Sequence, residues 1–118
     1  MEYRVTFYQT EDGHKPVVTL LETLRVGNPL LHKLLTAGLR KLKQRANHGE
    51  PLTKPISESM GILELRVGHT DIARVFFFFQ PNQEIVCTNG YVKKSQKLDQ
   101  GELAKAERYK IDWEQRHQ

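Results

Sequence analysis

The stretch that decides the fold is residues 62–92, ILELRVGHTDIARVFFFFQPNQEIVCTNGYV. Residues 62–67 alternate apolar and charged side chains, which is typical of a strand with one face in water. Residues 72–79 are almost continuously apolar and rich in aromatic side chains, which indicates a central strand, and residues 84–92 predict a third. Turn-forming residues separate these runs, at 68–70 and at 81–82. The pattern predicts a meander of three antiparallel strands.

Upstream of this meander, the sequence predicts one strand and a pair of helices. Residues 3–8 alternate apolar and polar side chains and indicate a strand. Helical spacing of apolar residues begins after Pro16 and stops at Gly27-Asn28-Pro29, and a second helix is expected from about Pro29 to Asn47. Residues 48–61 contain Gly49, Pro51 and Pro55, so we expect this segment to be mostly loop.

A last helix is expected to begin at Asp99, which is a suitable N-cap residue. Its apolar side carries Leu103, Ala106, Tyr109 and Trp113. The element order β-α-α-β-β-β-α predicts an α+β fold, in which a helix hairpin over residues 15–47 and the C-terminal helix flank a small, mostly antiparallel sheet. We expect residues 1–118 to form a single domain.

Composition excludes several classes of protein. Hydrophobic residues make up 38% of the 118, which argues against global disorder, and no apolar run is long enough to span a membrane. The N-terminal residues lack the pattern of a signal peptide, and the single cysteine, Cys87, can form no internal disulfide, so we expect a cytoplasmic protein. The net charge of +4 is a mild indication of an anionic partner. The basic residues gather in two clusters, one of Arg40, Lys41, Lys43 and Arg45 and one of Lys93, Lys94 and Lys97.

Several familiar chemical motifs are missing from the sequence. It has no glycine-rich phosphate loop and no nucleophile elbow, and its five histidines lack metal-ligand spacing, so we expect neither a cofactor nor a metal. Cys87 lies in the middle of a predicted strand among apolar residues. We interpret it as a buried structural thiol rather than a nucleophile.

Arg74 is the unusual residue of the central strand, because a charge within an apolar run needs a partner or water. One interpretation is a structural salt bridge to Glu64 on the neighbouring strand. The other is that Arg74 lines an anion site, while Glu64 holds it in place or serves as a base. The sequence leaves both open.

Residues 91–97, YVKKSQK, lie at the end of the last predicted strand and directly after it. Their lysines could meet phosphates and Tyr91 could stack on an unpaired base, which is the chemistry of an RNA-binding segment. The alternative is a solvated basic loop, because runs of charge usually face water.

Three segments carry a family resemblance: LELR at 63–66, IARVFF at 72–77 and YVKKSQK at 91–97, followed by a helix with Ala106 and Arg108. In this order they resemble the HigB-like, phage-derived branch of the RelE toxin superfamily, and the predicted order of elements extends the resemblance over nearly the whole chain. The resemblance implies the toxin of a type II toxin–antitoxin system, a ribosome-dependent endoribonuclease that cuts mRNA without a metal and so inhibits translation. It also implies a cognate helix-turn-helix antitoxin of the HigA type, with operator DNA bound only through that antitoxin.

In such toxins the ribose 2′-hydroxyl attacks the adjacent phosphate, so the protein must orient the nucleotide, help remove a proton and neutralise the charge on phosphorus. By resemblance, Arg74 stabilises the scissile phosphate, Glu64 occupies a position that holds a base or a lysine in different branches, and Lys93 and Lys94 match a basic pair after the last strand. These four are the expected catalytic residues. The expected RNA-binding residues are Tyr91, which could stack on a base, Lys97, which would contact phosphate, and Arg66, which would brace the site.

One position departs from the family pattern. Many members have a histidine two residues before the aromatic residue of the last motif, where this sequence has Asn89. An amide cannot transfer protons near neutral pH, so Lys94 or Glu64 would have to act instead, or activity would be weak.

Two other functions therefore stay open beside the enzyme. The same fold could bind ribosomal or messenger RNA without cutting it, or it could serve chiefly as a co-repressor subunit with its antitoxin. In every case we expect the antitoxin to cover the basic face formed by Arg66, Arg74, Lys93, Lys94 and Lys97.

Overall fold

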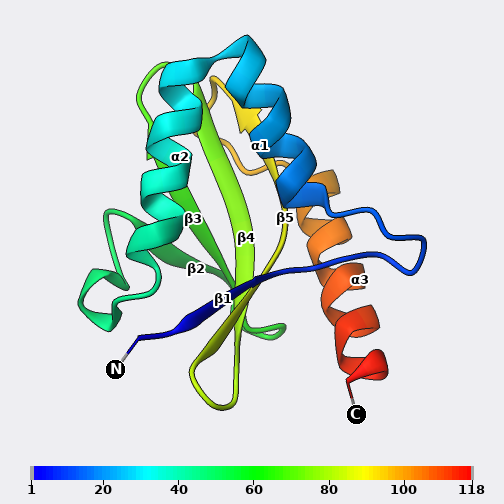
Figure 1. The fold of residues 1–118 in the computed structure, drawn as a ribbon. Coiled ribbons are helices and arrows are strands. Elements are labelled where there is room, and N and C mark those ends of the chain that lie inside the picture. The colour runs from blue at the N-terminus through cyan, green and yellow to red at the C-terminus, as the bar shows by residue number, and fades with distance from the viewer. Residues whose placement is uncertain (1, 118) are drawn as a thin grey trace.

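The computed structural model describes residues 2–117 and has an α+β fold in which three α-helices pack on a five-stranded sheet (Figure 1). The fold class predicted from the sequence is confirmed. The strands are β1 (Arg4–Phe7), β2 (Thr53–Ser57), β3 (Ile62–Gly68), β4 (Ile72–Gln80) and β5 (Glu84–Lys93). The helices are α1 (Pro16–Gly27), α2 (Pro29–Lys41) and α3 (Gln100–Arg116), with a short 3₁₀ turn at Arg45–Asn47.

The sheet has the strand order β1-β5-β4-β3-β2. All neighbouring strands are antiparallel except β1 and β5, which are parallel. The predicted meander of β3, β4 and β5 forms its centre, and β4 is buried over most of its length because both of its faces are covered. This explains why the sequence of β4 is continuously apolar rather than alternating.

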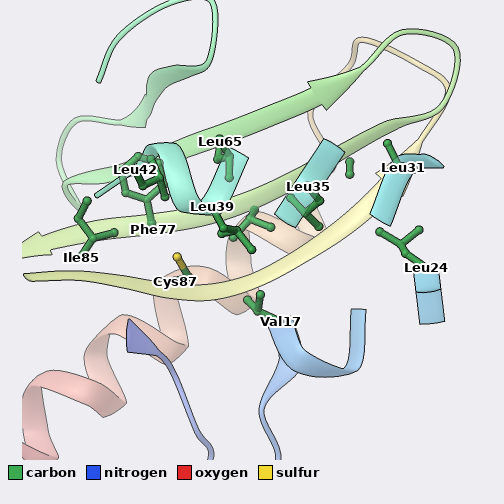
Figure 2. Close-up of a cluster of buried hydrophobic side chains, with 12 residues drawn as sticks. Val17, Leu24, Leu31, Leu35, Leu39, Leu42, Leu65, Phe77, Ile85 and Cys87 are labelled. Carbon is green, nitrogen blue, oxygen red and sulfur yellow. The ribbon is translucent and has the colours of Figure 1, made fainter. Parts of the chain in front are cut away.

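The helix hairpin of α1 and α2 covers one face of the sheet (Figure 1). Apolar side chains of both helices interdigitate with side chains from β3, β4 and β5, as Figure 2 shows for Leu35, Leu39, Leu65, Phe77 and Cys87. Full burial of each large side chain contributes about 1.5–3 kcal/mol. This layer is the main core of the molecule.

Helix α3 packs on the opposite face of the sheet. Trp113 and Tyr109 meet Tyr8, Phe78 and Val86 near one end of the helix. Near its start, apolar side chains of the helix and of the segment before it pack against Ile62, Phe76 and Tyr91. The two faces therefore belong to different layers, and side chains that alternate along β4 enter one or the other.

Both hairpin turns of the meander contain residues with positive φ. Gly68 ends β3 with φ of +100°, and a Cβ there would lie 2.2 Å from the Asp71 carbonyl oxygen, so glycine is required. Pro81, Asn82 and Gln83 connect β4 to β5, and Asn82 and Gln83 have left-handed φ values of 64° and 57°. The turns predicted at both places are confirmed.

The helix termini follow simple capping rules. Asp99 caps α3 as predicted, because its side chain accepts a hydrogen bond of 3.1 Å from the Glu102 backbone N–H. Helix α2, which we expected to reach Asn47, ends at Lys41 instead. The Asn47 side chain donates to the Lys41 carbonyl and the His48 ring lies 2.7 Å from the Leu42 carbonyl, so side chains satisfy the last carbonyls and the chain turns away.

The segment expected to be mostly loop contains β2. This strand pairs with β3 at the edge of the sheet, where the missing N–H of Pro55 costs little, and its register shifts between Pro55 and Ser57. Prolines therefore concealed a short edge strand from the sequence pattern. Among residues 2–117, no helix has the length and apolar content to cross a membrane.

Candidate functional site

The register of the central strands brings five of the seven predicted site residues to one region of the sheet. Arg66 lies opposite Arg74, and Arg74 lies opposite Tyr91. These side chains share the sheet face on which α3 packs, and they lie near the first residues of β4. We call the group of Glu64, Arg66, Arg74, Tyr91 and Lys93 the Arg74 face.

A β-bulge in β5 sets this arrangement. Val75 pairs with Gly90 and Phe77 with Cys87, so β5 has one residue more than β4 over this interval. Gly90 lies in the bulged region, where a Cβ would be 2.4 Å from the Arg74 carbonyl oxygen and 2.8 Å from Leu20 of α1. The absence of a side chain there allows α1 to lie close behind Arg74.

Arg74 and Glu64 form an ion pair inside the protein. Arg74 Nε lies 2.8 Å from Glu64 Oε1, and the two side chains are only 1% and 2% exposed. The distance is that of an ion pair, but the N–H bond does not point at the oxygen well enough for a hydrogen bond. Glu64 Oε1 accordingly has no hydrogen-bond partner within the described residues. The salt bridge, one of the two sequence interpretations of Arg74, is present.

The rest of the Arg74 guanidinium meets the connection between β5 and α3. Its Nη2 donates a 3.0 Å hydrogen bond to the Ser95 carbonyl, whereas Nη1 is buried and has no hydrogen-bond partner in the described part of the chain. A buried donor without a partner costs about 1–3 kcal/mol. Of the two terminal nitrogens of Arg74, Nη2 is thus held by the loop and Nη1 is left for an acceptor.

Tyr91 lies between Arg74 and the start of α3. Its ring centroid is 5.7 Å from Arg74 Cζ, within the range of a cation–π contact, and its hydroxyl oxygen accepts a 3.0 Å hydrogen bond from the Asp99 backbone N–H. Burial raises the pKa of the Tyr91 phenol, although the Asp99 N–H and the Arg74 charge act in the opposite direction. The phenol therefore stays protonated at neutral pH.

Arg66 and Lys93 hold the same loop from either side. Arg66 Nη1 donates to Gln96 Oε1 at 3.0 Å, and Lys93 Nζ lies 3.8 Å from Asp99 Oδ2. Arg66 and Arg74 are directly opposite on neighbouring strands, a placement of like charges that is unfavourable unless an anion lies nearby. Glu64, on the same face as both, supplies that anion.

Lys94 and Lys97 lie outside this network. Both are exposed in the connection that follows β5, and neither forms an ion pair within residues 2–117. They add exposed positive charge to the loop whose Ser95 carbonyl contacts Arg74.

Asn89 lies beside the Arg74 face and has a role that the sequence did not indicate. It is 3% exposed, and its Nδ2 donates to the Glu102 carbonyl at 3.1 Å and lies 3.3 Å from Glu102 Oε1. Thr88 donates to its Oδ1. Asn89 therefore joins the bulge of β5 to the first turn of α3, and its amide groups are occupied within the protein.

Ser95, Gln96 and Asp99 are also contacts that sequence reasoning missed. Asp99 was expected only as an N-cap, and its second contact with Tyr91 depends on the length of the connecting loop. The Ser95 contact is made by a backbone carbonyl, which any residue offers, so no sequence signal could have located it.

Cys87 is fully buried in the main core, and burial raises the pKa of its thiol to about 12. This agrees with its interpretation as a structural thiol. Within residues 2–117, no three histidine, cysteine, aspartate or glutamate side chains gather as a metal ligand set would.

Comparison with known families gives one match. The family model described as Phage derived protein Gp49-like (DUF891) matches residues 23–110, which is well over half of the chain and includes β2 to β5 with every residue of the Arg74 face. Comparison with curated proteins gives no match. The chain therefore belongs to the Gp49-like family of phage-derived proteins, which in general terms is a toxin family of the RelE/HigB kind.

Proposed function

We propose that this chain is the toxin of a type II toxin–antitoxin system and acts as a metal-independent endoribonuclease on mRNA in the ribosome. The observation that carries the proposal is the Arg74 face, where two arginines, a lysine and a tyrosine gather beneath a basic loop. Membership of a toxin family supports it. Action on the ribosome would place this chain in the cytoplasm. Its inhibitor would be a helix-turn-helix antitoxin of the HigA type.

The reaction needs no group beyond those of the chain and the RNA. The 2′-hydroxyl oxygen forms a bond to the adjacent phosphorus and gives up its proton, while the bond to the 5′-oxygen breaks and that oxygen gains a proton. The products are a 2′,3′-cyclic phosphate and a 5′-hydroxyl. Charge accumulates on the phosphate oxygens in the transition state, so a fixed cation nearby lowers the barrier.

Arg74 would supply that cation. Its Nη1 lacks a partner within the described chain and its Nη2 bonds a carbonyl, so a phosphate could accept from the first and replace Ser95 at the second. Because the side chain is 1% exposed, the connection over residues 94–98 must move before a phosphate reaches it. The Glu64 contact supports a positioning role for this carboxylate, since it is buried behind the guanidinium.

Of the remaining residues, some would orient the RNA and others would transfer protons. Lys93 and Lys94 would flank the phosphate, with Lys94 the exposed candidate for proton transfer. Tyr91 would orient a base or donate its phenolic proton, Arg66 would brace the loop through Gln96, and Lys97 would bind RNA phosphate.

The test is cleavage of mRNA on programmed ribosomes. Replacing Arg74 should lower the rate about a hundred- to thousand-fold, and replacing Lys94 somewhat less. Arg74→Ala leaves Glu64 buried and unpaired, so the paired variant Arg74→Gln with Glu64→Gln serves as a folded neutral substitute. Arg25→Ala, which removes an exposed arginine of α1, is the matched control and should cut normally.

Cleavage at the wild-type rate by a folded Arg74 variant would contradict the assigned role. Lys97→Ala should weaken ribosome binding and its salt dependence while leaving the chemical step almost unchanged.

A second function is favoured by Asn89. Because this residue has no titratable group and its amide is occupied by Glu102 and Thr88, it offers no proton transfer where related toxins often carry histidine. The chain would then bind ribosomal or messenger RNA without cutting it, or act mainly as a co-repressor with its antitoxin. Tight ribosome binding with intact mRNA in the same assay would favour this alternative.

A further inference from the structure

The end of α2 carries a group of basic residues that the proposed function does not use. Arg40, Lys41, Lys43 and Arg45 are all exposed, and none forms an ion pair within residues 2–117. We call these four the α2-end cluster. A cluster of exposed cations without ion-pair partners attracts anions, although salt screens its field, and these cations break no ion pair when an anion arrives.

The α2-end cluster lies far from the Arg74 face. The Tyr3 backbone N–H donates to the Lys43 carbonyl, which places the cluster beside the start of β1, where Arg4 pairs with Glu84. Lys93 pairs with Ile72 at one end of β4, whereas Glu84 pairs with Gln80 at the other, about 25 Å away at the usual rise of a strand. Helix α2 also packs on the other face of the sheet (Figure 1). No small ligand could touch both groups.

The surface at the cluster is hollowed. A groove of about 540 Å³ is lined by Arg40, Lys41 and Lys43 together with Ala37, Gln44, Asn47 and Glu2. The single carboxylate in the lining, that of Glu2, accepts a hydrogen bond of 3.0 Å from Gln44. The cations therefore outnumber the anion three to one along the groove.

The macrodipole of α2 explains only part of this charge. A helix C-terminus attracts cations within its last turn, which accounts for Arg40 and Lys41. Lys43 lies two residues beyond the end of the helix and Arg45 four, so the dipole favours Lys43 less than Arg40 and Lys41, and Arg45 least. The four cations within residues 40–45 exceed what the helix terminus requires, which favours an external anion.

The chemistry of the lining distinguishes between partners. The groove contains no exposed large apolar side chain, and a protein interface normally has an apolar or aromatic centre. It also contains no aromatic ring, so it offers no platform for the bases of a single strand. What it offers is lysine, arginine and amide groups, which are the usual contacts to a sugar–phosphate backbone.

An apolar surface lies at the N-terminal end of α2, opposite the α2-end cluster. There Leu30, Leu31 and Leu34 line a hollow of about 310 Å³ beside the β3–β4 turn. The two ends of α2 thus present different chemistry. Only its C-terminal end, with the α2-end cluster, has the character of a site for a polyanion.

We propose that the α2-end cluster binds the phosphate backbone of double-stranded RNA, as a second RNA contact separate from the Arg74 face. An RNA helix presents rows of phosphates that are read by shape and charge rather than by base. Binding at this end would anchor the chain to structured RNA while the Arg74 face stays free. The inference does not require that the chain cut RNA.

The test measures binding of an RNA duplex of about 16 base pairs, the length that shape-reading domains span. Fluorescence anisotropy over a range of salt concentrations compares the wild-type chain with the triple variant Lys41→Gln, Lys43→Gln, Arg45→Gln. The matched control, Arg25→Gln, Lys33→Gln, Arg108→Gln, removes the same number of exposed charges elsewhere. Circular dichroism confirms that both remain folded.

We expect the cluster variant to bind the duplex about tenfold or more weakly at 0.15 M salt, with the slope of log K against log salt reduced by about 2–3. The control should change this slope by less than half as much. Equal losses in the two variants would mean that only net charge matters, which would overturn the proposal.

Two further probes decide the class of partner. The affinity for single-stranded RNA of equal length should depend less on the cluster than the affinity for the duplex does. The cluster variant could bind poly-glutamate more weakly than the wild type does but bind the duplex equally well. In that case the surface is a protein site and the proposal is wrong. A wild-type chain that binds duplex through the cluster but cuts no mRNA would refute the proposed endoribonuclease and leave this inference standing.

Discussion

The Arg74 face and the α2-end cluster are both basic, yet their surroundings differ. Arg74 is fixed by Glu64, Tyr91 and the Ser95 carbonyl and is hidden from solvent, whereas Lys41, Lys43 and their neighbours project into water without ion-pair partners in the described chain. A fixed, desolvated charge acts strongly over a short range at one place. A mobile, hydrated charge acts weakly at many places and is screened by salt. Charge count alone would treat these regions as equal.

The largest expected difference between the two regions is in stability. Glu64→Ala leaves the Arg74 charge buried without its partner and should lower the free energy of unfolding by about 3–5 kcal/mol. Lys41→Ala in the α2-end cluster should change it by less than about 0.5 kcal/mol. Urea denaturation measures both.

The double variant Glu64→Leu with Arg74→Met tests the cause, because apolar residues of similar size should recover most of the lost stability. If Glu64→Ala were as mild as Lys41→Ala, the pair would contribute little and the contrast between the regions would fail.

The next effect concerns the backbone behind Arg74. Gly90→Ala would place a Cβ 2.4 Å from the Arg74 carbonyl oxygen, which is backbone and cannot easily move. We expect a loss of about 3 kcal/mol, at the upper end for overpacking. Gly27→Ala is the control, since a Cβ there meets nothing within 4 Å. Thermal unfolding of the two variants gives the comparison, and equal melting temperatures would show that the bulge can relax.

A smaller difference should separate two asparagines that make the same kind of bond. Asn89 donates to the Glu102 carbonyl in the interior, and Asn47 donates to the Lys41 carbonyl at the surface. Asn89→Ala leaves buried groups unpaired and should cost about 1–2 kcal/mol, whereas water replaces the bond lost in Asn47→Ala. Denaturation midpoints that shift equally would indicate that water also reaches the β5–α3 junction.

The smallest effect is expected at the hydrogen bond between Tyr8 and Asp112, because solvent reaches the half-exposed Asp112 carboxylate and screens the interaction. Burial first, and then the hydrogen bond to Asp112, raise the pKa of Tyr8 to about 12. Because the folded-state pKa lies above the ordinary value of 10, the phenol adds stability below pH 10 and loses it as the pH rises toward 12. Unfolding free energies of the wild type should therefore fall more steeply over this range than those of Tyr8→Phe. Parallel curves would exclude a contribution from this phenol.

The sequence predicted most of the fold because its information is local. Alternation in β3, the apolar run of β4, the cap at Asp99 and both turns depend on neighbouring residues, and the structure confirms them. The predicted end of α2 was wrong, and strand β2 was missed within a segment expected to be mostly loop. Both depend on partners that local patterns do not show, namely the Asn47 and His48 side chains for α2 and the edge of β3 for β2.

The candidate site could be predicted in part for the same reason. Strand register follows from the meander, so Arg66, Arg74 and Tyr91 could be placed together, and Glu64 could be named as the partner of Arg74. Gly90 within the predicted strand was the one residue-type sign of the bulge, whereas the contact of Ser95 is made by a backbone carbonyl and leaves no trace in residue types. The depth at which Arg74 is buried therefore could not be foreseen.

The position of Cys87 gives this chain a built-in reporter. Its thiol is the only one in the sequence, lies between the sheet and the helix hairpin, and has a pKa of about 12, so a thiol-specific reagent cannot attack it in the closed molecule. Labelling requires that α1 and α2 part from the sheet. The rate of modification under native conditions thus counts opening events of the main core directly, and a loop that moved alone over Arg74 would leave that rate unchanged.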